Sequence, residues 1–240
     1  MKRMFLCTVL LLVLAFPAAA SELPDFPFAY VTGNAEIEVP PDIATTTFRI
    51  EAFDKESERV MAAVEERSEE VVSLLEKYGI KRKDIVSYEL RKTTVREQRN
   101  YTRLGILGYE VDRRFSITIR ELERYGALAE ALLNVENLTE LNTVFDTTRR
   151  KAIEKDLIAQ ASANAREKAD ALAKGYGTQI EAVFAITADD TGFRHISGVF
   201  GLRSDSVGRA EAKLAAGSTL FVPTTIKFGR TATAIYRLEE

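Results

Sequence analysis

The feature that most constrains the fold is an alternation of apolar and polar residues that begins at Val31 and gives way to helical spacing after Lys55. Over residues 31–39 every second residue is apolar or small, which is the pattern of a strand with one buried face. Pro40-Pro41 has no backbone N–H to give to a sheet, so this strand ends there, and a second alternating run covers 44–52. The chain therefore opens with two strands joined by a Pro-Pro-Asp corner at Asp42.

The next segments predict an amphipathic helix and then a hairpin. The apolar residues of the helix recur at helical spacing, and Gly79 ends it: Val60, Val64, Val71, Leu75 and Tyr78. Alternation returns over 86–90 and 109–119, on either side of a polar stretch at 96–104. We interpret this as a long hairpin, with Gly105 and Gly108 as its hairpin glycines and not as a phosphate-binding loop.

The rest of the chain repeats the same succession of strand and helix patterns. It predicts a helix over 121–134, a strand over 138–145, a helix from Thr148 to Lys174 closed by Gly175, a strand over 181–188 and a last strand ending near Leu238. The order β-β-α-β-β-α-β-α-β-β lacks strict βαβ alternation. We therefore expect an α+β fold, with three main helices packed on a largely antiparallel sheet.

The helix from Thr148 has two unusual features. Its many alanines permit close approach to a sheet or to another helix. It also begins with Arg149-Arg150-Lys151, which places positive charge at the positive end of the helix dipole. Asp146 offers an N-cap that offsets part of this charge. Two interpretations of the basic turn stay open, a solvated turn and a surface for an anionic partner.

Residues 1–20 resemble a cleaved secretory signal peptide. Lys2 and Arg3 precede an apolar run that ends at Phe16, and small residues lead to a cleavage site between Ala20 and Ser21. The run is shorter than the ~20 residues that span a bilayer, which disfavours an uncleaved anchor. Cys7 is the only cysteine and leaves with the signal, so we expect a periplasmic protein without thiol or disulfide.

The composition of the mature chain limits its fold and its partners. The chain is 46% hydrophobic, which is enough to form a hydrophobic core. We expect residues 21–29 to be an extended lead-in, and residues 30–240 to be a single domain with a Gly-rich insertion at about 191–220. Without residues 1–20 there are 31 Lys and Arg against 36 Asp and Glu, a net charge of −5. This charge argues against a nucleic-acid surface, and no later segment is apolar for long enough to span a membrane.

Candidate catalytic groups are few. The single histidine, His195, lies in the Gly-rich stretch and has no second histidine to complete a metal pair. Asp189-Asp190 is an adjacent carboxylate pair, but neighbours on an extended chain point to opposite sides and acids before Thr191-Gly192 are ordinary turn formers. Asn100 and Asn137 each begin a glycosylation sequon, which matters only in a eukaryotic secretory pathway. We therefore predict no catalytic residues, no metal site and no cofactor.

Four stretches follow one another along the chain: the opening strand and corner at 31–44, Gly108-Tyr109 leading into 115–122, the Ala-Arg-x-Lys-Ala-x-x-Leu-Ala run at 165–173, and the closing strand at 232–238. In this order they resemble the SIMPL-domain family, the periplasmic immunogenic-protein and oxidative-stress-defence group of bacterial envelope proteins. The approach to that last strand, through Pro223 and then Lys227-Phe228-Gly229, departs from the Pro-Gly ending usual in the family. The resemblance implies an extracytoplasmic α+β domain, often self-associating, linked to envelope stress and without an agreed enzymatic activity.

Two functional hypotheses follow. The first is a non-enzymatic periplasmic protein that acts by self-assembly, as a homo-oligomer, or by binding an envelope partner. The second is a periplasmic enzyme or small-molecule-binding protein that uses carboxylates in a cleft. A pocket with buried, perturbed carboxylates would favour the second, and an uncovered strand edge or apolar patch would favour the first. Under the first hypothesis we expect the apolar half of 191–220 to dock on a neighbouring subunit, the alternative being a loop folded over its own sheet.

Overall fold

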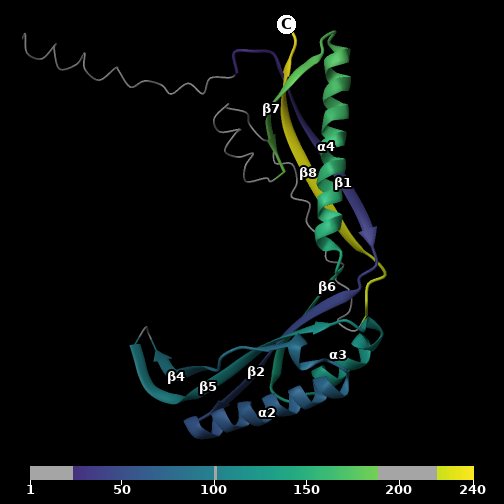
Figure 1. The fold of residues 1–240 in the computed structure, drawn as a ribbon. Coiled ribbons are helices and arrows are strands. Elements are labelled where there is room, and N and C mark those ends of the chain that lie inside the picture. Colours follow the sequence, from purple (N-terminus) through teal and green to yellow (C-terminus); the bar gives the residue numbers. More distant parts are fainter. Residues whose placement is uncertain (1–23, 100–101, 189–220) are drawn as a thin grey trace, which may run out of the picture. The chain divides into compact units, whose positions relative to one another are not determined.

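The computed structural model describes residues 24–99, 102–188 and 221–240, which form two compact units (Figure 1). The first, here called the three-stranded unit, contains described residues 24–35, 158–188 and 230–240. The second, here called the five-stranded unit, contains described residues 36–99, 102–157 and 221–229. Strands β1 (Phe28–Val39) and β8 (Ile226–Leu238) and helix α4 (Arg150–Gly175) contribute residues to both.

The five-stranded unit is built on an antiparallel sheet. Its strands are β2 (Ile43–Asp54), β3 (Ile85–Ser87), β4 (Arg91–Arg99), β5 (Thr102–Ile119) and β6 (Leu138–Asp146). The order is β3-β5-β2-β6, and β4 pairs with β5. In the central pair Phe48 lies opposite Phe115, and on the other side of β2 Thr47 lies opposite Asn142.

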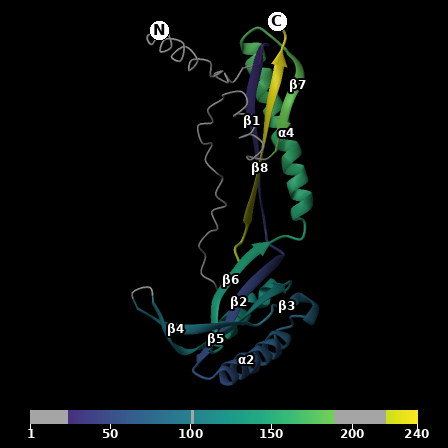
Figure 2. The same cartoon turned by 90° about the vertical axis from the view of Figure 1, so that its left-hand side faces the viewer.

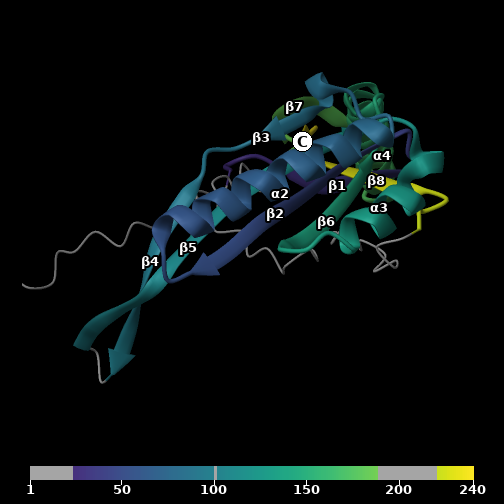
Figure 3. The same cartoon turned by 90° about the horizontal axis from the view of Figure 1, so that it is seen from below.

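One face of this sheet carries the main core. Helices α2 (Ser57–Lys77) and α3 (Tyr125–Leu133) pack there, with short 3₁₀ turns at Arg82–Asp84 and Leu122–Arg124 (Figure 3). The rings of Phe48 and Phe115 stack at 5.2 Å between centroids. The predicted helical spacing is confirmed, because Val60, Val64, Val71 and Leu75 are all buried. Gly79 has φ +86°, so it takes the left-handed conformation expected after a helix.

The three-stranded unit has the strand order β1-β8-β7, with β7 at Ile180–Thr187 (Figure 2). The hydroxyls of Thr32 and Thr233 lie 3.1 Å apart between β1 and β8, and the Leu238 N–H donates to the Pro27 carbonyl at 2.9 Å. Helix α4 packs on β1 and β8. The small core consists of Val31, Ala165, Ala169, Ala234 and Tyr236, with Ile180 at its edge. The alanines predicted to permit close approach are therefore buried against strands.

The predicted α+β fold and its order of elements are confirmed, but the hairpin differs. The polar stretch 96–104 was expected between the strands, whereas Arg96–Arg99 belongs to β4 and Thr102–Leu104 to β5. Gly105 and Gly108 lie within β5, not at a turn. The strand predicted over 86–90 is shorter, β3 at Ile85–Ser87, and β4 is the strand that the sequence did not predict. The difference arises because a ladder of backbone hydrogen bonds does not require apolar side chains, so a ribbon without a buried face shows no alternation.

Candidate functional site

Several residues singled out in the sequence lie outside the described part of the chain. They are the cleavage site at Ala20 and Ser21, Cys7, Asn100, the Asp189-Asp190 pair, His195 and the whole segment 191–220. Asn137, which begins the second sequon, is described and has φ 64°. The candidate sites below therefore come from other residues.

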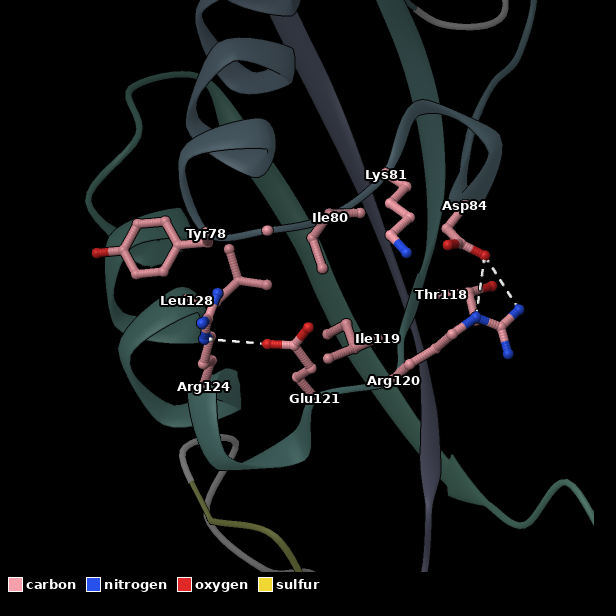
Figure 4. A pocket seen from close by; sticks show the side chains of 11 residues that line it. Tyr78, Ile80, Lys81, Asp84, Thr118, Ile119, Arg120, Glu121, Arg124 and Leu128 are labelled. Atoms are coloured by element: carbon pink, nitrogen blue, oxygen red, sulfur yellow. Dashed lines mark hydrogen bonds and ion pairs between the residues drawn. The ribbon is translucent and has the colours of Figure 1, made fainter.

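The first candidate is a cavity in the five-stranded unit, at the C-terminal end of α2 and of β5 (Figure 4). Its most buried acid is Asp84, whose Oδ1 accepts hydrogen bonds from Arg120 Nε at 3.2 Å and from Arg120 Nη2 at 3.0 Å. Arg124 Nε lies 3.1 Å from the carboxylate of Glu121. Both carboxylates are thus paired with arginines, as Figure 4 shows, and neither is placed to act as a free base.

The size of this cavity also limits what it can bind. It holds about 60 Å³, whereas pockets that bind metabolite-sized ligands have volumes of ~300–1,000 Å³. The space suits a few water molecules. The second hypothesis, an enzyme or small-molecule binder, gains no support from this cavity.

The second candidate is the carboxylate of Asp42, which follows the Pro-Pro corner and binds the start of α4. Its Oδ1 accepts the Thr148 N–H at 2.7 Å, and its Oδ2 accepts the hydroxyls of Thr148 at 2.8 Å and Thr147 at 3.2 Å. The hydrogen bond from the Thr148 backbone is the main reason that the pKa of Asp42 is lowered; partial burial opposes this effect, and the positive charge of Arg149 adds to it. This carboxylate orders a helix start, which is a structural role.

Of the three basic residues at the start of α4, Arg150 is the one held in ion pairs with nearby acids. Arg150 Nε lies 2.7 Å from Asp146 Oδ2, and Arg150 Nη1 lies 3.4 Å from Glu154 Oε1. The hydrogen bond with Asp146 is the main reason that the pKa of Arg150 is raised. The guanidinium also lies 4.8 Å from the ring centre of Phe228. Asp146 therefore offsets the charge, as predicted, but the helix-start N–H of Thr148 goes to Asp42 and not to Asp146.

The third candidate is an ionic network on the face of the five-stranded sheet that the helices leave uncovered. Asp112 is buried and pairs with Arg91 Nε at 2.7 Å and with Arg49 Nε at 3.6 Å. Arg49 also reaches Glu140 at 2.9 Å and Glu51 at 3.9 Å. The network contains two arginines and three carboxylates, and each of them lies in at least one ion pair, so this face is a polar surface built of paired side chains.

The fourth candidate is strand β7, one of the two outer strands of the three-stranded sheet. Three large apolar side chains on it are exposed and define what we call the β7 surface: Val183 at 53%, Phe184 at 48% and Ile186 at 74%. Only Ile180 of β7 packs against the core of this unit, because α4 covers β1 and β8 instead. No other described strand pairs with the outer edge of β7. An edge strand with large exposed apolar side chains is a ready template for another chain.

The sequence held a signal for this surface that the periodicity argument did not use. Residues 182–186, Ala-Val-Phe-Ala-Ile, are continuously apolar, a pattern expected of a strand buried on both faces. In the structure β7 is instead an edge strand with apolar groups in solvent. Strand β7 has the composition of a buried strand but is exposed in the single chain. It is therefore the strongest candidate binding surface among the described residues.

Neither a metal centre nor a membrane helix is found in the described ranges. No group of three or more His, Cys, Asp or Glu side chains is arranged there to hold a metal ion. None of the helices in those ranges is long and apolar enough to cross a membrane.

Comparison with known proteins assigns the family. Residues 29–236 match the model of the SIMPL family, described as a protein of unknown function (DUF541), so the chain belongs to this family. It is similar to the uncharacterized protein YggE of Edwardsiella ictaluri, with 27% identity over 72% of each chain. It is also similar to YggE of Escherichia coli K12 and of Shigella flexneri, with 25% identity over 92% of this chain and 87% of theirs. The resemblance of the four sequence stretches is therefore confirmed, and the family match extends across both units.

Proposed function

We propose that this SIMPL protein is exported to the bacterial periplasm and works there by self-association through the β7 surface, without an enzymatic activity. The observation that carries the proposal is the edge strand β7, on which Val183 and Ile186 are more than half exposed; Phe184 is 48% exposed, and its ring also packs against Phe26 at 5.0 Å between centroids. Because an edge strand can pair with a strand of another chain, a second strand can add to the sheet and bury these side chains at once.

A second copy of the chain is the occupant that the charges of β7 favour. The one ionised side chain of the strand, Glu181, already pairs with Arg237 at 2.8 Å. The remaining residues are Ala, Val, Phe, Ile and one Thr, so two antiparallel copies of β7 bury no uncompensated charge against each other. A twofold contact in which a patch meets its own copy is also the commonest way in which identical chains assemble.

The cellular role follows from the sequence and from the family resemblance. The signal-like segment supports export, and the family resemblance supports a part in envelope or oxidative stress. In this proposal the assembled protein presents a surface to envelope components. The ion pairs of Asp112 with Arg91 and of Asp84 with Arg120 hold these two buried acids in structural contacts, which supports a role without catalysis.

The test is the molar mass of residues 21–240 by size-exclusion chromatography with light scattering. We expect an oligomer for the wild type and a smaller mass for the double variant Val183→Lys/Ile186→Lys, because charge on an edge strand opposes strand addition. Leu172→Lys is the matched control, since Leu172 is 46% exposed but lies on α4. A monomeric wild type, or a double variant with the mass of the wild type, would refute assembly through β7.

A further inference from the structure

Strand β1, the other outer strand of the three-stranded sheet, has backbone groups bonded by side chains of α4. Lys168 Nζ donates a hydrogen bond to the Thr32 carbonyl at 2.9 Å, and the Asn34 N–H donates to Asn164 Oδ1 at 3.1 Å. Residues two apart in a strand direct their backbone groups to the same edge, so both contacts lie on one edge of β1. No other described strand pairs with this edge. Two backbone groups that a further strand would need are therefore already bonded.

The close packing of α4 on β1 brings these two side chains to the edge (Figure 1). Gly33 lies between the two bonded residues of β1, and a Cβ there would collide with the backbone of α4. Asn164 and Lys168 are four residues apart, so they lie on the same face of the helix. Ala165 and Ala169 are buried against the strands and fix the rotation of α4 about its axis. This rotation directs Asn164 and Lys168 to β1, and neither side chain hydrogen-bonds to β7.

The space beside the β1 edge is wide enough for an extended segment. A groove of about 410 Å³ lies there, and its lining includes the apolar side chains of Val31 and Leu172. Bulk alone therefore does not keep a strand away from β1. The exclusion of a strand depends on the side chains that occupy the edge.

Lys168 also brings a positive charge to this edge. Its ammonium group is bonded to the Thr32 carbonyl and not to an acid of the described chain. A strand that paired with β1 would displace the ammonium group and enclose it beside the apolar lining of the groove, and burial of an unpaired charge is costly. Lysine on an outer strand is a common means by which sheets resist edge-to-edge pairing. Here the lysine comes from a neighbouring helix.

We propose that Asn164 and Lys168 close the β1 edge to strand addition and so determine which edge of the three-stranded sheet assembles. If both edges were open, β7 of one copy would pair with β1 of the next, and such a head-to-tail contact repeats in rings or open filaments. With β1 closed, β7 meets only another β7, and this twofold contact ends at two copies. The closure of β1 depends on α4 alone, whereas the use of β7 rests on the proposed function.

The test removes both side chains from the edge in residues 21–240. Asn164→Ala/Lys168→Ala should have a molar mass by light scattering about twice that of the wild type or more, rising with protein concentration, because each added copy leaves a new edge open. Gln160→Ala/Lys174→Ala is the matched control, since it removes an amide and a lysine from exposed positions on the same helix. Lys168→Arg keeps the charge and a donor for the Thr32 carbonyl. We expect the wild-type mass for both of these variants.

Amide hydrogen exchange measures the contact itself. In Asn164→Ala the Asn34 amide should exchange about two- to tenfold faster than in the wild type, which corresponds to the usual net contribution of one hydrogen bond. This readout does not depend on the oligomeric state. An unchanged exchange rate at Asn34 would overturn the proposal.

Two results of the mass measurement would also overturn it. One is an Asn164→Ala/Lys168→Ala variant with the wild-type mass at every concentration, and the other is an equal gain of mass in the Gln160→Ala/Lys174→Ala control.

Addition of Val183→Lys/Ile186→Lys to the Asn164→Ala/Lys168→Ala variant separates this proposal from the proposed function. A return to a smaller mass supports both, because β7 is then the strand that pairs with the opened β1. A large mass that persists supports the closure of β1 and refutes assembly through β7.

Discussion

Gly33 on β1 lies directly against the backbone of Ala165 in α4: a Cβ placed on Gly33 would be 2.3 Å from the Ala165 nitrogen and 2.0 Å from the Ala161 carbonyl oxygen. Both contacts are to backbone atoms, so no side-chain rotation can relieve them. The close approach explains why α4 presents alanines to the sheet, because larger side chains would hold the helix away from β1.

Gly33→Ala is therefore expected to destabilise the protein by about 1–3 kcal/mol, the usual cost of overpacking. The measurement is the free energy of unfolding in urea. Gly105→Ala is the control, since a Cβ there meets no atom within 4 Å. If both variants unfold at the same urea concentration, the proximity of β1 and α4 is wrong.

The Asp42 carboxylate should make stability depend on pH. Its pKa is lowered by the hydrogen bond from the Thr148 backbone, so the folded state favours the ionised form. This contribution is fully present above the unfolded-state pKa of about 3.9 and is lost as the pH falls through the lower pKa of the folded state.

As the pH falls below about 4, the Asp42→Asn variant should therefore lose less stability than the wild type. At neutral pH, Asp42→Ala should cost about 1 kcal/mol, comparable to the loss of a helix cap. Thermal unfolding from pH 7 to pH 2 measures both effects, with Glu58→Gln on α2 as the control. A wild type and an Asp42→Asn variant with parallel pH curves would contradict the assignment.

The Asp112 network predicts an asymmetry between its partners. Asp112→Ala leaves Arg49, whose side chain is only 15% exposed, without its closest buried acid, and should cost about 1–3 kcal/mol. Arg91→Ala removes a partner whose side chain is 62% exposed and screened by solvent, and should cost less than Asp112→Ala. Urea unfolding of the two variants measures the difference. If the two variants lose the same free energy of unfolding, the contact between Asp112 and Arg49 adds nothing to stability beyond the contact between Asp112 and Arg91.

Export gives the fourth prediction. Intact mass spectrometry of the protein from its host should find a chain that begins at or near Ser21, because a charged start, a short apolar run and small residues before the cut meet separate requirements of a signal peptide. A protein that keeps Met1 and stays with membranes after high-salt washing would show that the segment is an anchor.

The periodicity of apolar residues located most helices and strands, because an element that buries one face must place apolar residues at regular spacing. The residues from Val60 to Leu75 that predicted α2 are the ones buried on the sheet, and the alternating residues around Phe48 and Phe115 form the core. It failed at residues 96–99 and 102–104, which belong to β4 and β5 although their sequence does not alternate. The capping role of Asp42 was equally out of reach, because Thr148 is 106 positions away along the chain.

By itself, the sequence determined the α+β class, the order of strands and helices and the family, since these depend on local spacing and on motifs read along the chain. Only the tertiary structure decided which strand lies at an edge, which acids are paired and which apolar side chains remain in water. Ile186 on β7 and Ile106 on β5 are as apolar in sequence as the buried Ile117. What separates them is whether another element covers them, and that depends on contacts between residues far apart in the chain.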